Sequence, residues 1–430
     1  MADSNLTKPN LNSETQLHTL RRIALAGLVV LLACLIWTTG RAGFATLLYT
    51  FAARANQPNA AGAAVTLSPR DAQAHYIRGA ALEFNGDAHA ALTEYTQAVV
   101  LRPRDYVLWL ALAHARELTG DLPSAIAAAN EAVARAPFYA PAHWQLGNLL
   151  IRAGRHDGGF SELRLASESD PTLLPAVIDL AGHLASDHPE YVLAALQPHS
   201  PEAYLALFAY FRKQGNFRQA SAMLRAAGAA GQAERRTFIE ALIVAQQFRE
   251  AYALWGKGPV ADPDGPERAL LNDPSFEDES DLNEPGFGWR APNKTQSFSL
   301  ALDGVNPKAG EWSAAFEFKG EPEPNQAILS QLVLLEPHTH YQLQFSVRTA
   351  TLVSGGLPFL NVVDAVTQQS LAQTETFPQD RSDWQDYSLE FTTAGSSEAV
   401  QIAVRRQPCS KTPCPIFGRL WLDNFSLQRL

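Results

Sequence analysis

Two of the three cysteines in this chain lie close together, and their spacing limits the chemistry that they can do. Cys409 and Cys414 stand in the sequence RQPCSKTPCPI with four residues between them. Such a pair can bind a metal, exchange electrons with another dithiol or form a small disulfide loop. A zinc site would need two further Cys or His ligands nearby, and a thioredoxin-type site would have two residues between its cysteines. A disulfide is therefore favoured, and it requires an oxidising compartment.

The compartment is indicated by an uncharged apolar run near the N-terminus. Residues 23–40, IALAGLVVLLACLIWTTG, lie between Arg22 and Arg41. As a helix this run is about 27 Å long, close to the hydrocarbon thickness of a bilayer. The alternatives are a buried core helix, a cleaved signal peptide and a lipoprotein signal ending at Cys34. The run has no amphipathic face, no strong cleavage site and no polar stretch after Cys34, so we predict an uncleaved transmembrane signal anchor.

Basic residues predict the orientation of this anchor. Lys8, Arg21 and Arg22 precede it, so residues 1–22 are predicted to stay in the cytoplasm as a short tail. The rest of the chain would then lie on the periplasmic side of the inner membrane. That location favours the disulfide of the C-terminal cysteine pair. It also leaves Cys34 as a small apolar residue inside the membrane.

The sequence shows no recognisable catalytic constellation. It lacks a Gly-x-Ser-x-Gly elbow, a His-Glu-x-x-His motif and a Gly-rich phosphate loop. A glycosidase would need two carboxylates facing each other across a cleft, and the sequence alone does not pair them. His338 and His340 stand in a turn before a strand, where surface or structural roles are the default. We predict a protein that is not an enzyme and needs no cofactor, with a polysaccharide-modifying hydrolase as the distant alternative.

After the anchor, the sequence repeats with a step of 34 residues. The registers are Gly79, Ala113 and Gly147; Gly86, Gly120 and Gly154; Ala98, Ala132 and Ala166; and Pro69, Pro103, Pro137 and Pro171. A small residue such as Gly79 lets two helices cross closely, and Gly86 can end the first helix of a unit. This pattern resembles the tetratricopeptide repeat, which implies a superhelical array of helix–turn–helix units. We predict this array for residues 41–258, with weaker units toward its end, among them Leu174–Leu196, which has lost the turn glycine.

The resemblance implies that the first helix of each unit faces a groove that binds peptides or other proteins. Trp144, Asn148 and Arg152 follow one another at i, i+4 and i+8 on one helical face of the third unit. Tyr76 and His114 stand at comparable places in the two preceding units. We predict that these five side chains form a protein-binding groove. The alternatives are that Trp144 only packs between units and that His114 is an ordinary surface histidine.

The pattern changes near residue 270 from the helical period to alternation. Alternating segments such as YQLQFSVR, AVQIAVR and WQDYSLEFT predict an antiparallel β-sandwich over residues 269–430, after a linker at 259–268. The segments LLNDPSFE with GFGW, KAGEWSAAFEF, LLEPHTHYQLQFSVRT, and DWQDYSLEFTT to GRLWLDNFSL occur in this order. They resemble the jelly-roll modules of the galactose-binding-like type, which include many carbohydrate-binding modules. The predicted fold class is therefore multidomain, α plus β.

The jelly-roll resemblance implies a structural calcium ion. Acidic residues of the first and last strands often hold it, and here these are Glu277 in SFE and Asp423 in LDNF. The alternative is a pair of surface carboxylates. Polysaccharide binding is implied by the resemblance alone, because a sugar ring is usually stacked on a solvent-facing aromatic side chain. No tryptophan is left over as an obvious platform, since core or strand positions are expected for all four in this domain: Trp289, Trp312, Trp384 and Trp421.

Together these features predict a single-pass, membrane-anchored scaffold of the cell envelope. The repeat array would bind a protein partner and the jelly roll would contact polysaccharide, as in exopolysaccharide assembly or export. The alternative is a pure protein–protein adaptor that binds no sugar. The net charge of −10 and the lack of a basic stripe give no support for a nucleic-acid partner, and none is predicted.

Overall fold

The computed structural model describes residues 11–186, 188–256, 270–278, 286–292, 297–320, 327–395, 397–409 and 413–430. The chain consists of two compact units, Met1–Gln197 and Pro198–Leu430. The predicted linker at 259–268 lies outside the described residues, as do the first ten residues of the predicted cytoplasmic tail.

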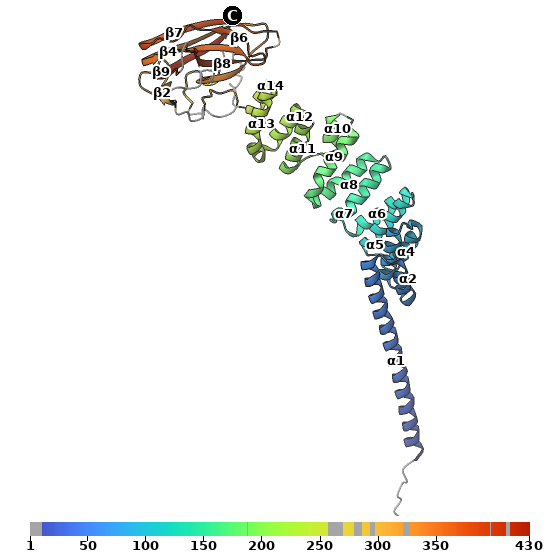
Figure 1. Ribbon diagram of the computed structural model, residues 1–430. Helices are drawn as coiled ribbons and strands as arrows, with labels where there is room; N and C mark the ends of the chain where they lie inside the picture. The colour runs from blue at the N-terminus through green and yellow to red at the C-terminus, as the bar shows by residue number, and fades with distance from the viewer. Residues whose placement is uncertain are drawn as a thin grey trace, which may run out of the picture. The chain divides into compact units, whose positions relative to one another are not determined.

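Helix α1 spans Leu11–Ala55 and contains the predicted anchor (Figure 1). Within it, Thr19–Ala55 is long and apolar enough to cross a membrane, and the most apolar stretch is not buried by the described chain. Ala45 and Ala52 are fully buried where the end of α1 contacts α2 and α3. Helix α1 is thus continuous from the apolar segment to its contacts with α2 and α3.

The rest of the first unit consists of helix pairs. Its elements are α2 (Pro58–Leu67), α3 (Ala72–Phe84), α4 (Ala88–Leu101), α5 (Tyr106–Leu118), α6 (Leu122–Arg135), α7 (Ala140–Arg152), α8 (His156–Ser169), the 3-10 turn η1 (Pro171–Leu173), α9 (Leu174–Ala185) and α10 (Pro189–Leu196). The helices α3, α5 and α7 begin 34 residues apart, and so do α4, α6 and α8. The predicted repeats are therefore confirmed as helical hairpins.

Small residues set how closely the paired helices approach. A Cβ atom on Gly79 would lie 2.7 Å from the ring of Tyr95, and one on Gly147 would lie 2.7 Å from Leu163. The turn residue Gly86 has a φ of 86°, in the left-handed region that glycine adopts without strain. In the weaker unit, Ser186 takes this place with a φ of 44°. The predicted roles of the glycines are confirmed.

In each of the three clearest repeats, a side-chain ring nitrogen lies close to the carbonyl oxygen of a proline at the same repeat position. Trp109 donates its Nε1–H to the carbonyl oxygen of Pro103 at 2.9 Å. His75 and His143 stand 34 residues on either side, and their Nε2 atoms lie 3.1 and 2.9 Å from the carbonyl oxygens of the equivalent prolines. The Nδ1 atom of each histidine lies 2.7 Å from a glutamate carboxylate. Each of these contacts pairs the carbonyl of a proline that directly follows the C-cap residue of the preceding helix, a feature that was not predicted from the sequence.

The second unit begins with four more helices. These are α11 (Pro201–Lys213), α12 (Phe217–Ala226), α13 (Gln232–Val244) and α14 (Phe248–Trp255), with the 3-10 turn η2 (Gly228–Gly231) before α13. Tyr252 and Trp255 of α14 pack their rings on Phe287, at centroid distances of 4.9 and 5.9 Å. These last helices therefore contact the polypeptide that leads into the β-sheets. The predicted boundary between the array and the sandwich stays a prediction.

The strands of the second unit form two antiparallel sheets. They are β1 (Phe298–Asp303), β2 (Ser313–Gly320), β3 (Leu329–Leu334), β4 (His340–Ser354), β5 (Pro358–Asp364), β6 (Ser370–Gln373), β7 (Asp380–Thr392), β8 (Ala399–Arg406) and β9 (Ile416–Arg429). One sheet has the order β1-β2-β9-β4-β7 and the other the order β3-β8-β5-β6. The predicted antiparallel sandwich is confirmed, and the three alternating segments lie in β4, β8 and β7.

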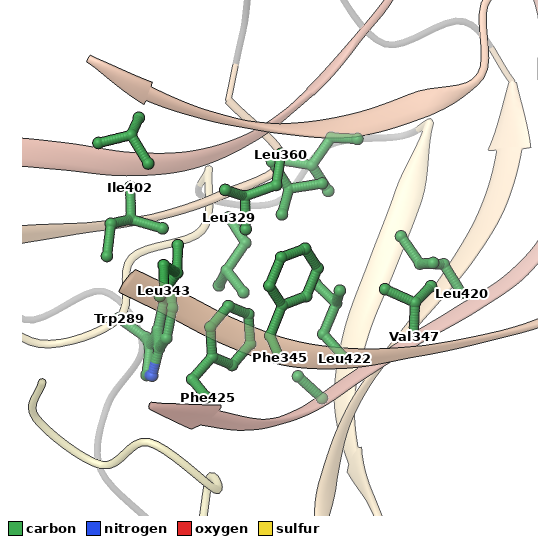
Figure 2. Close-up of a cluster of buried hydrophobic side chains, with 14 of the residues drawn as sticks. Trp289, Leu329, Leu343, Phe345, Val347, Leu360, Ile402, Leu420, Leu422 and Phe425 are labelled. Carbon is green, nitrogen blue, oxygen red and sulfur yellow. The ribbon is translucent and has the colours of Figure 1, made fainter. Parts of the chain in front are cut away.

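The two sheets enclose one apolar core (Figure 2). Phe345 of β4 stacks on Phe425 of β9 at 5.2 Å, and Trp289 packs on Phe425 at 4.7 Å. The expected first strand, around SFE, is instead a turn region, but it lies beside β9 because Phe425 donates its backbone N–H to the carbonyl of Pro274 at 2.9 Å. Core residues from β3, β5 and β8 complete the packing from the opposite sheet.

Candidate protein-binding groove

The first helices of three successive repeats line a groove of about 720 Å³. Tyr76, His114, Trp144 and Asn148 all lie in its lining, as the repeat register predicted. Arg152 is not a lining residue, but its guanidinium forms an ion pair with the lining residue Glu117. The remaining lining residues are Asn56, Ala80, Glu83, Phe84, Tyr95, Val107, Leu110, Ala111 and Gln145. The structure thus brings together the side chains that were selected by their spacing.

Repeat positions explain which side chains meet in the groove. Tyr76 and Trp144 occupy the same position two repeats apart, and Leu110 stands between them. His114 and Asn148 share a second position, one helical turn further along. In a solenoid, equivalent repeat positions line up along the array. Tyr76 and Trp144 therefore form two aromatic walls of the groove from one repeat position. The wall side chain Trp144 is half-buried.

Two carboxylates in the groove face a single imidazole. The Nε2 atom of His114 lies 3.3 Å from a carboxylate oxygen of Glu83, and its Nδ1 atom lies 3.7 Å from one of Glu117. Tyr95 donates its hydroxyl to Glu83 at 3.1 Å. The two glutamates stand 34 residues apart, at the same repeat position. Neither glutamate was predicted from the sequence, although both follow the 34-residue step of the glycines.

Negative charge dominates this side of the groove. Burial raises the pKa of Tyr76, and the charges of Glu83 and Asp105 raise it further. Burial also raises the pKa of Tyr95, with a further increase from the charge of Glu83 and from the hydrogen bond to it. Both phenols are therefore neutral at physiological pH, and they place aromatic surface beside Glu83. Such a lining is suited to recognition of a cationic or apolar group.

The predicted calcium residues of the sandwich hold a loop by hydrogen bonds. Asp423 of β9 is fully buried and accepts the backbone N–H groups of Lys308 and Ala309 at 2.7 and 3.0 Å. Glu277 accepts the backbone N–H groups of Glu311 and Trp312 at 2.9 and 3.2 Å. The two carboxylates, which are far apart in sequence, thus bind neighbouring parts of the segment before β2.

This donor set meets only part of what calcium requires. Calcium takes about six to eight oxygen ligands, whereas the oxygens of Glu277 and Asp423 face N–H donors. Among the residues that the structure describes, no group of three or more His, Cys, Asp or Glu side chains could hold a metal. Further ligands would have to be backbone carbonyls or water, and the calcium site stays a prediction.

The outer face of the five-stranded sheet carries an aromatic–cation stack. The guanidinium carbon of Arg348 lies 4.2 Å from the ring centroid of Trp421 and 5.1 Å from that of Trp384. The strand neighbours Val347 and Leu422 point into the core, so Arg348 and Trp421 point the other way. Trp384 is half-buried there, and Trp312, just before β2, is exposed by 37%, which corrects the expectation that no tryptophan is left as a platform. Sequence alternation could not separate this face from the core face without the strand register.

The predicted disulfide joins Cys409 and Cys414, whose Cα atoms are 5.8 Å apart. It closes the connection between β8 and β9. The buried side chain of Arg406 donates to the carbonyl oxygen of Cys414 at 2.8 Å and to the Ser354 hydroxyl at 2.9 Å. Arg406 thereby links Cys414 to Ser354 at the end of β4. The third cysteine, Cys34, is free and exposed on α1.

Comparisons with known proteins show structural likeness only. No protein-family model matches the sequence, and no curated protein matches it. Among solved structures, MamA residues 41 to the end from Desulfovibrio magneticus RS-1 covers 40% of this chain and 97% of its own length, at 20% identity and a TM-score of 0.34. Another structure of MamA covers 38% of this chain and 91% of its own, at 19% identity and a TM-score of 0.32.

A third similar structure is described as "CBM4 structure and function". It covers 37% of this chain and 99% of its own length, at 12% identity and a TM-score of 0.27. TM-scores and identities this low carry no argument about function. The function proposed below therefore rests on the residues of this chain.

Proposed function

We propose that this protein is a membrane-anchored adaptor of the cell envelope whose repeat array binds a protein partner. The observation that carries the proposal is the groove of the first unit, in which Tyr76, His114, Trp144 and Asn148 converge. Its lining is aromatic and charged, with Phe84 exposed by 72% at its edge. Lining of this kind is suited to binding a peptide segment.

Membrane anchoring is the second part of the proposal. Residues 23–40 would cross the inner membrane, with residues 1–22 in the cytoplasm and both folded units in the periplasm. The length and exposed apolar surface of α1 support a membrane span or a signal sequence, and Arg21 and Arg22 at its edge favour the orientation. The disulfide between Cys409 and Cys414 suits an oxidising compartment.

Contact with polysaccharide, in exopolysaccharide assembly or export, is the third part. Trp384 and Arg348 offer a half-buried aromatic ring and a cation on one sheet face, and sugar rings stack on such aromatic surfaces. Because Arg348 already contacts the Trp384 ring, a sugar would share this ring with the guanidinium. The alternative is an adaptor that binds protein alone.

The groove is tested by crosslinking in intact membranes. Trp144→Ala removes an aromatic wall, so we expect loss of specific crosslinked partners that the wild-type chain captures. Phe138→Ala is the matched control, because this aromatic side chain is 88% exposed and does not line the groove. An identical set of partners for wild type and Trp144→Ala would contradict the proposed groove.

Polysaccharide contact is tested by titrating the full-length protein with soluble glucans, xylans, galactans and extracted envelope polysaccharide. We expect Trp384→Ala to weaken binding and Phe138→Ala to preserve it, since Phe138 is an 88% exposed aromatic side chain between α6 and α7, outside the sandwich. No binding by the wild-type protein would favour the pure protein adaptor. The calcium prediction is tested in parallel by melting with and without a chelator, and an unchanged midpoint would remove it.

A further inference from the structure

We propose that the groove selects a basic segment of its protein partner, with a Lys or Arg side chain placed between Glu83 and Glu117. This inference rests on the proposed function of the groove and adds the chemistry of the occupant. It would also assign to the two glutamates, which repeat at one position, a role in partner recognition.

The composition of the lining supports a cationic occupant. Two carboxylates line the groove, and no Lys or Arg does so among the described residues. The side chains of Glu83 and Glu117 are exposed by only 24% and 18%, so water screens them less than it screens open surface charges. The nearest cation, Arg152, is 62% exposed and pairs with Glu117 at the edge. An acidic segment would meet like charge here and is disfavoured.

The geometry around His114 shows that a planar donor fits between the carboxylates. Its two ring nitrogens face Glu83 and Glu117 from opposite sides, at 3.3 and 3.7 Å. An Arg guanidinium is also planar and carries five N–H donors, and a Lys ammonium carries three. Because the His114 side chain is 48% exposed, it can turn toward solvent when a cation from the partner takes its place.

Aromatic side chains next to the carboxylates provide the rest of the site. Tyr76 and Tyr95 pack with ring centroids 5.9 Å apart beside Glu83, and Trp144 lies on the other side of the lining. A cation over an aromatic face gains about 0.5–1 kcal/mol at exposed sites. Exposed Phe84 offers apolar surface to the residue next to the basic one. The matching motif is a Lys or Arg beside an aromatic or aliphatic residue.

The electrostatics at Tyr76 agree with these contacts. The pKa of Tyr76 is raised first by burial and then by the charges of Glu83 and Asp105. A negative potential that disfavours a phenolate also favours a cation at the same place. Asp105, the N-cap residue of helix α5, adds to the negative potential that Glu83 creates at Tyr76.

The test is a selection of random 12-residue peptides, displayed on phage, against the full-length protein in lipid nanodiscs. The wild type and the double variant Glu83→Gln/Glu117→Gln are compared. The amide side chains keep the shape and an acceptor for Tyr95 while the charge is removed. Glu190→Gln is the matched control, because Glu190 is 72% exposed and does not line the groove. Thermal melts of each variant verify the fold.

We expect the wild type and Glu190→Gln to enrich peptides with Lys or Arg beside an apolar residue. Selected peptides should bind the double variant about tenfold more weakly, and added salt should reduce the difference. Enriched peptides without basic residues, or equal binding to the double variant, would overturn the basic-segment inference and leave the groove intact. No enrichment above that of Trp144→Ala would overturn the groove itself.

Discussion

The repeat array and the β-sandwich of this protein build their contacts from different distances along the chain. In the array, Gly79 packs on Tyr95 and Gly147 on Leu163, each pair sixteen residues apart. In the sandwich, the backbone of Lys308 binds Asp423 across 115 residues. Periodic contacts between residues close in sequence produce a pattern that can be recognised in the sequence. Contacts between residues far apart in sequence depend on how the strands pair.

The largest expected effect is a loss of stability in the core of the sandwich that leaves the helices of the first unit unchanged. Phe345→Ala removes a fully enclosed ring from the sandwich and should cost about 3–5 kcal/mol in its free energy of unfolding. Because the helices of the first unit do not depend on this core, their far-ultraviolet circular dichroism should melt as in the wild type. Hydrogen exchange of the strand amides, followed by mass spectrometry, reports the sandwich, because tryptophans such as Trp109 and Trp144 of the array also contribute to the fluorescence. Simultaneous loss of both signals would show that the two regions unfold as one.

A single added methyl group should disrupt the close packing of two paired helices. Gly147→Ala would place its Cβ 2.7 Å from Leu163, and we expect a loss of about 1–3 kcal/mol. Gly158→Ala is the matched control, since its Cβ would lie 3.7 Å from Leu150, an ordinary contact. That change should stabilise helix α8 by about 0.5–1 kcal/mol. Urea unfolding followed by helical circular dichroism measures the change in the free energy of unfolding for both variants. Changes of the same sign in the two variants would contradict the close crossing at Gly147.

Removal of the disulfide should affect the sandwich and leave the array unchanged. Cys409→Ser/Cys414→Ser opens a short loop, and chain entropy assigns this about 2 kcal/mol. Mild reductant should reproduce the loss in the wild type but not in the double variant. A reductant effect of equal size in both proteins would contradict this origin. Cys34→Ser controls for the remaining thiol.

The smallest expected effect is a difference in pH dependence between two carboxylates of the sandwich. Burial raises the pKa of Asp423, so the folded state holds the proton more tightly than the unfolded chain. Its contribution to stability should therefore grow as the pH falls through its folded-state pKa. Asp386 is the opposite case: its hydrogen bonds with Lys308 and Ser346 lower its pKa, so its contribution is lost on acidification.

The measurement is urea unfolding from neutral to mildly acidic pH. The stability difference between wild type and Asp423→Asn should grow in favour of the wild type as the pH falls, and that between wild type and Asp386→Asn should shrink. Parallel pH profiles for the two variants would contradict the assigned environments.

Sequence reasoning recovered the array in more detail than the sandwich. The 34-residue step located the helix pairs, the close crossing at Gly79 and four of the lining residues of the groove. Glu83 and Glu117 follow the same step, so the sequence pattern also places them at one repeat position. In the sandwich, alternation located β4, β7 and β8, but the segment around Glu277 is a turn region where a strand was expected.

The sequence by itself determined which segments are helical hairpins, which are strands, and where one apolar helix precedes them, because local periodicity follows from backbone geometry. Only the tertiary structure decided that His114 lies between two carboxylates, that Glu277 and Asp423 hold the segment before β2, and that Arg348 lies between two tryptophans. These arrangements depend on side-chain rotamers and on strand register, which place residues far apart in sequence within a few ångströms of each other.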